Sequence, residues 1–115
     1  MVDEITIREA QREVTGYLRA KGEGWTGLNN HYYVATHLVE EVGELARAII
    51  NMESKATERN RRGADRSHEE KLTAVRDGLG DVLFHLLKLS VAYGLDLEEA
   101  FHLSMRNIRA KYPEK

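Results

Sequence analysis

The stretch from Leu38 to Ile50, LVEEVGELARAII, constrains the fold of this chain more than any other feature. With about 3.6 residues per turn, a helix here gathers its apolar side chains within roughly 60° and leaves acids beside them. At spacings of three and four residues the carboxylates repel one another by about 0.2–0.5 kcal/mol per pair, and only Arg47 compensates nearby. The stretch therefore predicts a core helix whose acidic side is either screened by water or faced by a cation from elsewhere. The apolar positions are Leu38, Val42, Leu45 and Ile49, and the acids are Glu40, Glu41 and Glu44.

A second acidic stripe lies in the stretch from Ala74 to Gly94, AVRDGLGDVLFHLLKLSVAYG, which is otherwise almost entirely apolar. Because apolar residues flank Asp81, we expect its carboxylate to be partly buried. A buried carboxylate is costly unless it is paired or coordinates a metal. Two acid-bearing helices together predict one shared cation. The polar positions of the second helix fall within an arc of roughly 80°, and they are Asp77, Asp81, His85 and Lys88.

Two short motifs resemble a known family. Residues 40–44, EEVGE, have the form EExxE, and residues 79–84, LGDVLF, look like the second signature of the all-α, MazG-like nucleoside triphosphate pyrophosphohydrolases. The resemblance covers roughly residues 25–113. It implies a four-helix fold that hydrolyses an NTP or dNTP to the monophosphate and pyrophosphate with Mg²⁺, or alternatively Mn²⁺, in house-cleaning of the nucleotide pool. The family's second motif is ExxD, and Gly78 stands in place of its glutamate, so Gly78→Glu is predicted to raise metal affinity and turnover.

The resemblance also implies roles for individual residues. The metal ligands would be Glu41, Glu44 and Asp81, with Asp77 as a partial substitute for the missing glutamate. Glu40 is the candidate base, and Glu41 is the other catalytic carboxylate. An aromatic face can stack on any base with about 1–3 kcal/mol, although a tryptophan in a glycine-rich loop is as often an anchor on the core. The implied substrate contacts are Trp25, His85, Lys88, Asn107 and Lys111.

The chemistry expected of this set is metal-assisted phosphoryl hydrolysis. Mg²⁺ takes oxygen ligands, keeps several waters and binds through a few carboxylates together with substrate phosphates. We expect the metal to neutralise charge on the triphosphate while one carboxylate deprotonates the attacking water. By the resemblance, cleavage lies between the α- and β-phosphates. The chain has no HExxH, EF-hand or GxxxxGK[ST] motif, which excludes zincin, calcium-sensor and P-loop functions.

Helical periodicity predicts an all-α fold in a single domain, residues 1–115, with no strand pattern. The glycine-rich segment GEGWTGLNN, residues 22–30, is predicted to be a loop. The last helix should turn an apolar stripe inward, formed by Leu97, Ala100, Phe101, Ser104 and Ile108. The four helices are expected at about residues 6–21, 31–52, 68–93 and 96–111.

Capping signals locate the helix ends. Sequences of the S/T-x-x-E form open the first and third helices, at residues 6–9 and 67–70, and Asp96 is placed to cap the fourth. Gly94 suits the end of the third helix. The mid-helix Gly43 costs about 1 kcal/mol relative to alanine, which close approach of another helix would explain, and Gly80 is expected to permit close packing too.

Residues 79–91 are apolar nearly all round, so the third predicted helix carries more apolar surface than one thin bundle can cover. We therefore expect a homodimer or a dimer of dimers. A basic run from Lys55 to Lys71 is either a solvated loop or, if it lies over a metal site, a source of arginines for phosphates.

Charge and cysteine content narrow the remaining functions. A formal net charge of −2 gives no drive toward nucleic acid or membrane, and the chain has no cysteine for a disulfide or zinc site. A charged N-terminus without a long apolar run predicts a cytoplasmic protein. The alternative function, which Gly78 keeps open, is a catalytically impaired MazG-like helical oligomer that binds nucleotide or a protein partner. Phosphoribosyl-ATP pyrophosphohydrolase would need a further signature that the chain lacks.

Overall fold

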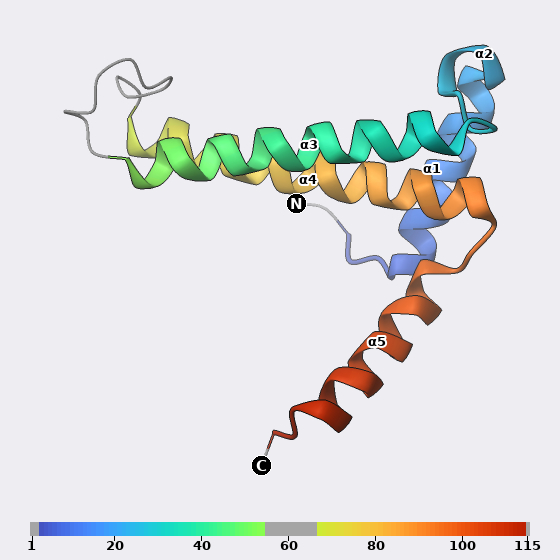
Figure 1. Cartoon of the computed structure of the whole chain (residues 1–115). Coiled ribbons are helices and arrows are strands. Elements are labelled where there is room, and N and C mark those ends of the chain that lie inside the picture. The colour runs from blue at the N-terminus through green and yellow to red at the C-terminus, as the bar shows by residue number, and fades with distance from the viewer. Residues whose placement is uncertain (1–2, 55–66, 115) are drawn as a thin grey trace. The chain divides into compact units, whose positions relative to one another are not determined.

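The computed structural model describes residues 3–54 and 67–114, and every regular element within them is an α-helix. This confirms the all-α prediction, and the four predicted helices agree with α1, α3, α4 and α5 to within one residue at each end. The prediction of a loop over residues 22–30 is wrong in part, because four of these residues form α2. A helix of a single turn is too short to leave a periodic pattern in the sequence. The elements, labelled in Figure 1, are α1 (Ile7–Lys21), α2 (Glu23–Thr26), α3 (His31–Glu53), α4 (His68–Tyr93) and α5 (Leu97–Lys111).

The chain divides into two compact units, and each is described by itself. The terminal unit consists of residues 1–31 and 87–115, and the hairpin unit consists of residues 32–86. The hairpin unit holds most of α3 and α4. The terminal unit holds α1, α2, α5 and the last residues of α4. The expectation of a single domain stays a prediction. Most of the basic run that starts at Lys55 lies outside the described residues.

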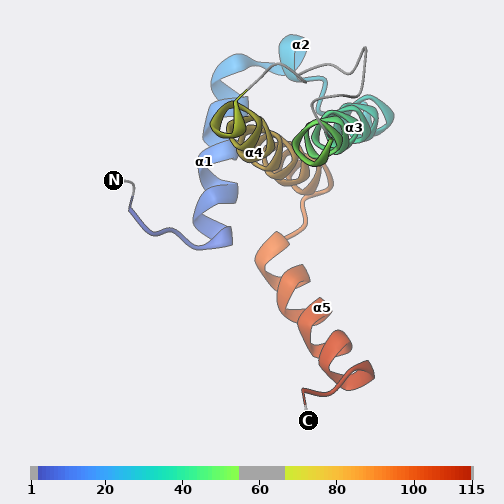
Figure 2. The ribbon, with the colours of Figure 1, turned by 90° about the vertical axis from the view of Figure 1, so that its left-hand side faces the viewer.

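Within the hairpin unit, α3 and α4 lie side by side and run in opposite directions (Figure 2). The His37 and His85 rings stand with their centroids 6.0 Å apart. Further along, Leu45 meets Gly78. Because the contacting residue numbers rise along α3 while they fall along α4, the two helices are antiparallel. The acidic stretches of the two helices lie between these two contacts, at the same level along the pair.

Gly78 marks a close approach of the two helices. A Cβ at this position would lie 3.0 Å from Leu45 Cδ1 and 3.3 Å from Leu45 Cα. The predicted benefit of Gly78→Glu is opposed by this geometry, because a side chain here presses on the α3 backbone. The interpretation of Gly43 and Gly80 as close-packing sites is also wrong for the chain alone, since a Cβ on either would meet nothing within 4 Å.

The predicted N-terminal caps are confirmed. In the first box, Thr6 N donates to Glu9 Oε1 over 2.7 Å, and Glu9 N donates to Thr6 Oγ1 over 3.0 Å. In the second, Ser67 N donates to Glu70 Oε1 over 3.0 Å and Glu70 N donates to Ser67 Oγ over 3.2 Å. Each box satisfies two backbone donors that the first turn of a helix would otherwise leave unpaired.

The turn between α4 and α5 follows the sequence signals as well. Gly94 has a φ of 67°, in the left-handed region that favours glycine. Gly94 N donates to Val91 O, and Leu95 N donates to Ser90 O, which together form a Schellman ending for α4. Asp96 then caps α5, its Oδ1 accepting from the backbone N–H groups of the next turn at 3.0 and 3.4 Å.

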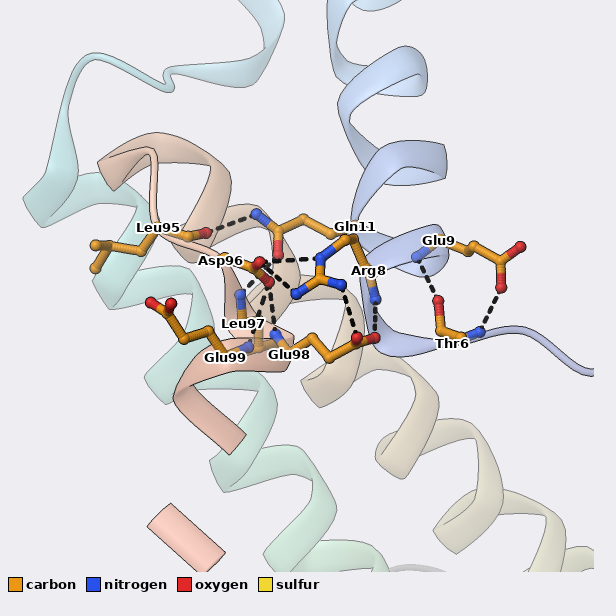
Figure 3. A network of polar contacts seen from close by, with 9 residues as sticks. All are labelled: Thr6, Arg8, Glu9, Gln11, Leu95, Asp96, Leu97, Glu98 and Glu99. Atoms are coloured by element: carbon orange, nitrogen blue, oxygen red, sulfur yellow. Dashed lines mark hydrogen bonds and ion pairs between the residues drawn. The ribbon is translucent and has the colours of Figure 1, made fainter. Parts of the chain in front are cut away.

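A polar network holds the start of α1 against the α4–α5 turn in the terminal unit (Figure 3). Arg8 donates from Nε and Nη2 to Asp96 Oδ2 over 2.9 and 2.7 Å, and its Nη1 lies 2.9 Å from Glu98 Oε2. Gln11 donates to Leu95 O over 2.7 Å and accepts from Leu97 N over 2.9 Å. The hydrogen bond from Arg8 is the main reason why the pKa of Asp96 lies below its ordinary value.

Buried apolar side chains are few in the part of the chain that the structure describes, and α5 has none. The predicted inward stripe of α5 is therefore not covered in the single chain, where Phe101 is 47% and Ile108 is 49% exposed. No described helix is by itself long and apolar enough to cross a bilayer. The bent pair of α4 and α5 has the length and apolar content of a membrane span only when the two helices are counted together. The buried apolar residues are Val14, Leu18, Val34, Ala48 and Leu87.

Candidate functional site

The EExxE acids line an open groove on α3 of the hairpin unit. The groove encloses about 550 Å³, and its lining carries three carboxylates against a single guanidinium. Its negative charge is therefore only partly compensated from within the lining. The lining residues are Glu40, Glu41, Gly43, Glu44 and Arg47.

The pKa of Glu41 reflects the burial of its carboxyl and the charges around it. Its pKa is raised, first by burial and next by the negative charge of Glu44. Asp81, on the facing helix α4, raises it further, while His85 on the same helix lowers it. The hairpin therefore brings the predicted ligands Glu41, Glu44 and Asp81 into electrostatic range of one another, together with His85.

His85 is held in one tautomer. Its Nδ1 lies 2.8 Å from Asp81 O, and because a carbonyl oxygen only accepts, Nδ1 carries the proton. In the neutral ring the lone pair is then on Nε2. On α3, His37 Nε2 lies 4.0 Å from Glu40 Oε1, three residues on.

The donor set has the chemistry of a site for a hard cation, since its three predicted ligands offer carboxylate oxygens alone. Their geometry is not that of an assembled metal centre: no group of three His, Asp or Glu side chains within residues 3–54 and 67–114 is placed to hold an ion. Asp81, expected to be partly buried, is exposed in the single chain. Asp77 is engaged by Arg76, whose Nη2 lies 3.0 Å from Asp77 Oδ1.

Two of the predicted substrate residues meet in the terminal unit. Trp25 lies on α2 with 53% of its surface exposed, and Lys88 Nζ stands 5.9 Å from the centre of its ring. Lys88 is buried, which lowers its pKa. Sequence reasoning missed Lys21, whose Nζ lies 4.8 Å from the same ring, although the spacing of four residues from Trp25 was a signal. Tyr17 meets the indole edge-on at 6.1 Å.

The remaining predicted substrate residues lie elsewhere. Asn107 and Lys111 are exposed on α5, and Lys111 Nζ stands 5.6 Å over the ring of its neighbour Tyr112. His85 belongs to the hairpin unit. The substrate roles of all five residues stay predictions, as do the ligand roles of the carboxylates.

The fold and the acids define a helical protein with a carboxylate-rich face on an antiparallel helix pair. The chain matches the family model of the MazG nucleotide pyrophosphohydrolase domain over residues 29–115, which is well over half of its length. It therefore belongs to the MazG nucleotide pyrophosphohydrolase family. Both acidic motifs fall inside the match, whereas Trp25 precedes it. Neither a search of curated proteins nor a search of solved structures gave a match.

Proposed function

We propose that this chain hydrolyses nucleoside triphosphates or their deoxy forms to the monophosphate and pyrophosphate, with Mg²⁺ or Mn²⁺, in house-cleaning of the nucleotide pool. The observation that carries the proposal is the set of incompletely matched carboxylates on two facing helices of a MazG-family chain. Glu41, Glu44 and Asp81 repel one another, and a bound cation would relieve this electrostatic repulsion.

Glu41, Glu44 and Asp81 would hold the metal, which when bound supplies neutralisation of charge on the phosphates. Glu40 is the candidate base for the attacking water, with His37 beside it to orient its carboxylate. Asp77 is a weaker candidate ligand because Arg76 already pairs with it.

In the terminal unit, Trp25 offers a half-exposed aromatic face, with cations of two lysines near its ring. Such a face suits stacking of a nucleobase, and the lysines suit the negative charge of a nucleotide. We retain Trp25 and Lys88 as proposed substrate contacts and add Lys21. Asn107 and Lys111 remain weaker proposals, since nothing in their surroundings favours a nucleotide over solvent.

Incubation with a panel of NTPs and dNTPs plus Mg²⁺ tests the activity, with separate assays for pyrophosphate and orthophosphate. We expect pyrophosphate and a nucleoside monophosphate from the wild type, and neither from Asp81→Asn. Glu53→Gln is the matched control, because it removes one exposed carboxylate of α3 outside the EExxE groove. Orthophosphate with a nucleoside diphosphate would reject the proposal.

A second candidate, the catalytically impaired family member, is favoured by one observation. Gly78 stands where the ExxD glutamate is expected, and its contact with Leu45 leaves little room for a side chain. Nucleotide binding without turnover would support this candidate. Titration of the single tryptophan's fluorescence with a nucleotide, run beside the product assays, separates the two functions.

We also propose that the chain associates with itself. Leu79 and Leu83 on α4 are at least half exposed, and the apolar stripe of α5 is uncovered. A second copy presents the same surfaces, and a two-fold interface buries the same patch on both copies. Size-exclusion chromatography with light scattering should give at least twice the chain mass of 13.1 kDa. A stable monomer would contradict the proposal.

A further inference from the structure

A groove in the terminal unit has features of an anion site that the acidic motifs do not explain. It lies between α1 and the α4–α5 turn and encloses about 380 Å³. Positions 8, 12, 15 and 19 of α1 all line it, and their spacings place them within roughly 60° on one face of the helix. Three of these four positions are arginines: Arg8, Arg12 and Arg19.

The charges in this groove do not cancel. Asp96 is the only carboxylate residue in the lining that the structure describes, and it is already bound by Arg8, which also pairs with Glu98. Within residues 3–54 and 67–114, the side chains of Arg12 and Arg19 make no ion pair or hydrogen bond, and Glu9 acts on Arg12 only through its field. The groove therefore has two guanidinium groups with no bound counter-charge.

The opposite wall is preorganised. Gln11 ties Leu95 and Leu97 to α1, and Arg8 ties Asp96, so the turn is held in place by the network in Figure 3. Gly94 adds no side chain at the rim. A wall fixed before a ligand arrives lowers the entropy that binding must overcome.

The chemistry of the lining selects the ligand. A guanidinium presents paired N–H donors that match phosphate oxygens, so two unpaired arginines favour a phosphorylated anion. Arg12 and Arg19 are separated by about 10 Å along the helix axis, so a chain of phosphates reaches both more readily than one phosphate does. The lining has no aromatic residue among those described, so a base would gain no stacking.

We propose that this groove binds a compact polyphosphate, either free or as the phosphate tail of a nucleotide, through Arg12 and Arg19. The inference is independent of the proposed hydrolase function, because it uses none of the residues assigned to catalysis or metal binding. It predicts that affinity rises from orthophosphate to pyrophosphate to triphosphate, and that binding needs no divalent metal.

Calorimetric titration of the full chain with inorganic triphosphate, in the presence of a chelator, tests the proposal. The chelator removes metal-dependent binding at the acidic motifs, so failure here and failure of the hydrolase proposal are distinguishable. Arg12→Gln/Arg19→Gln should weaken binding by about tenfold or more. The control, Arg106→Gln/Arg109→Gln, removes the same two charges from α5 and should bind as the wild type does.

Absent binding to the wild type, unchanged binding to Arg12→Gln/Arg19→Gln, or an equal loss in the control would each overturn the proposal. ATP, titrated in the same way, separates the two sources of polyphosphate. We expect ATP to bind no more tightly than inorganic triphosphate. If the adenosine strengthened binding by about tenfold through Arg12 and Arg19, the compact, base-independent site would be rejected.

Discussion

The two units treat their carboxylates in opposite ways. In the terminal unit, Asp96 accepts hydrogen bonds from Arg8 and from the first turn of α5, and its pKa is lowered. In the hairpin unit, the pKa of Glu41 is raised, first by burial and next by the negative charges of Glu44 and Asp81. The first arrangement stabilises the ionised form with groups of the chain itself, and the second leaves it short of positive charge.

The two kinds of carboxylate suit different roles, one structural and one in ligand binding. Acids that are paired within the chain, such as Asp96 and Glu98, hold α1 to the start of α5, and this structural role accounts for them. Acids that repel one another on facing helices lower stability, and such sites are where a ligand has most to contribute. This contrast supports our proposal that a catalytic metal binds in the hairpin unit.

The largest expected effect is on turnover. Glu44→Gln or Asp81→Asn should reduce kcat/KM for a nucleoside triphosphate by a factor of about 100 or more, because each removes a proposed ligand. Circular dichroism should show the helices intact. Glu98→Gln, a change in the terminal unit, should alter stability rather than turnover. Full activity in both hairpin variants would break the comparison.

The glycines of α4 give the next effect. Gly80→Ala should raise the free energy of unfolding by about 1 kcal/mol, because the position is open and alanine favours a helix. Gly78→Ala should gain much less or lose stability, since its Cβ would crowd Leu45 at 3.0 and 3.3 Å. Urea denaturation of both variants measures the difference. Equal gains would mean that α3 and α4 do not approach at Gly78.

The smallest effects are those on pH dependence, and their signs are opposite. The folded chain binds the Glu41 proton more tightly than the unfolded chain does, so folding is penalised as pH rises through the raised pKa. Glu41→Gln should therefore stabilise the protein at neutral pH and have no effect once the carboxyl is protonated in both states.

For Asp96 the stabilising contribution is present above the ordinary carboxyl pKa and is lost as pH falls through the lowered value. Asp96→Asn should thus destabilise the protein at neutral pH and converge on the wild type in acid. Thermal midpoints of both variants between about pH 3 and about pH 8 provide the test. Midpoint differences of the same sign at neutral pH would contradict the opposite environments of the two acids.

Much of the fold was accessible from sequence because its signals are local. The capping boxes at Thr6 and Ser67 and the left-handed Gly94 follow from residue type and spacing, and the structure bears them out. The four-residue α2 was missed because a single turn has no periodicity. The acidic face of α3 was predicted from the spacing of EExxE, and in the structure its acids line a groove.

Features that depend on tertiary contacts were not accessible. The closeness of Gly78 to Leu45 requires knowledge of how α3 and α4 align, and sequence reasoning assigned close packing to Gly80 instead. The exposure of Asp81 depends on what packs against α4, which its apolar neighbours do not reveal. The unpaired arginines of α1 became notable only because the α4–α5 turn closes a groove beside them.

Mg²⁺ titration by calorimetry tests the central claim most directly, namely that the acids of the hairpin unit are completed by an external cation. The wild type should bind Mg²⁺, and Glu44→Gln/Asp81→Asn should weaken that binding by about tenfold or more. Glu98→Gln/Glu99→Gln removes two acids of the terminal unit and should leave Mg²⁺ affinity unchanged. Absence of binding to the wild type, or equal affinity in all three proteins, would contradict the account.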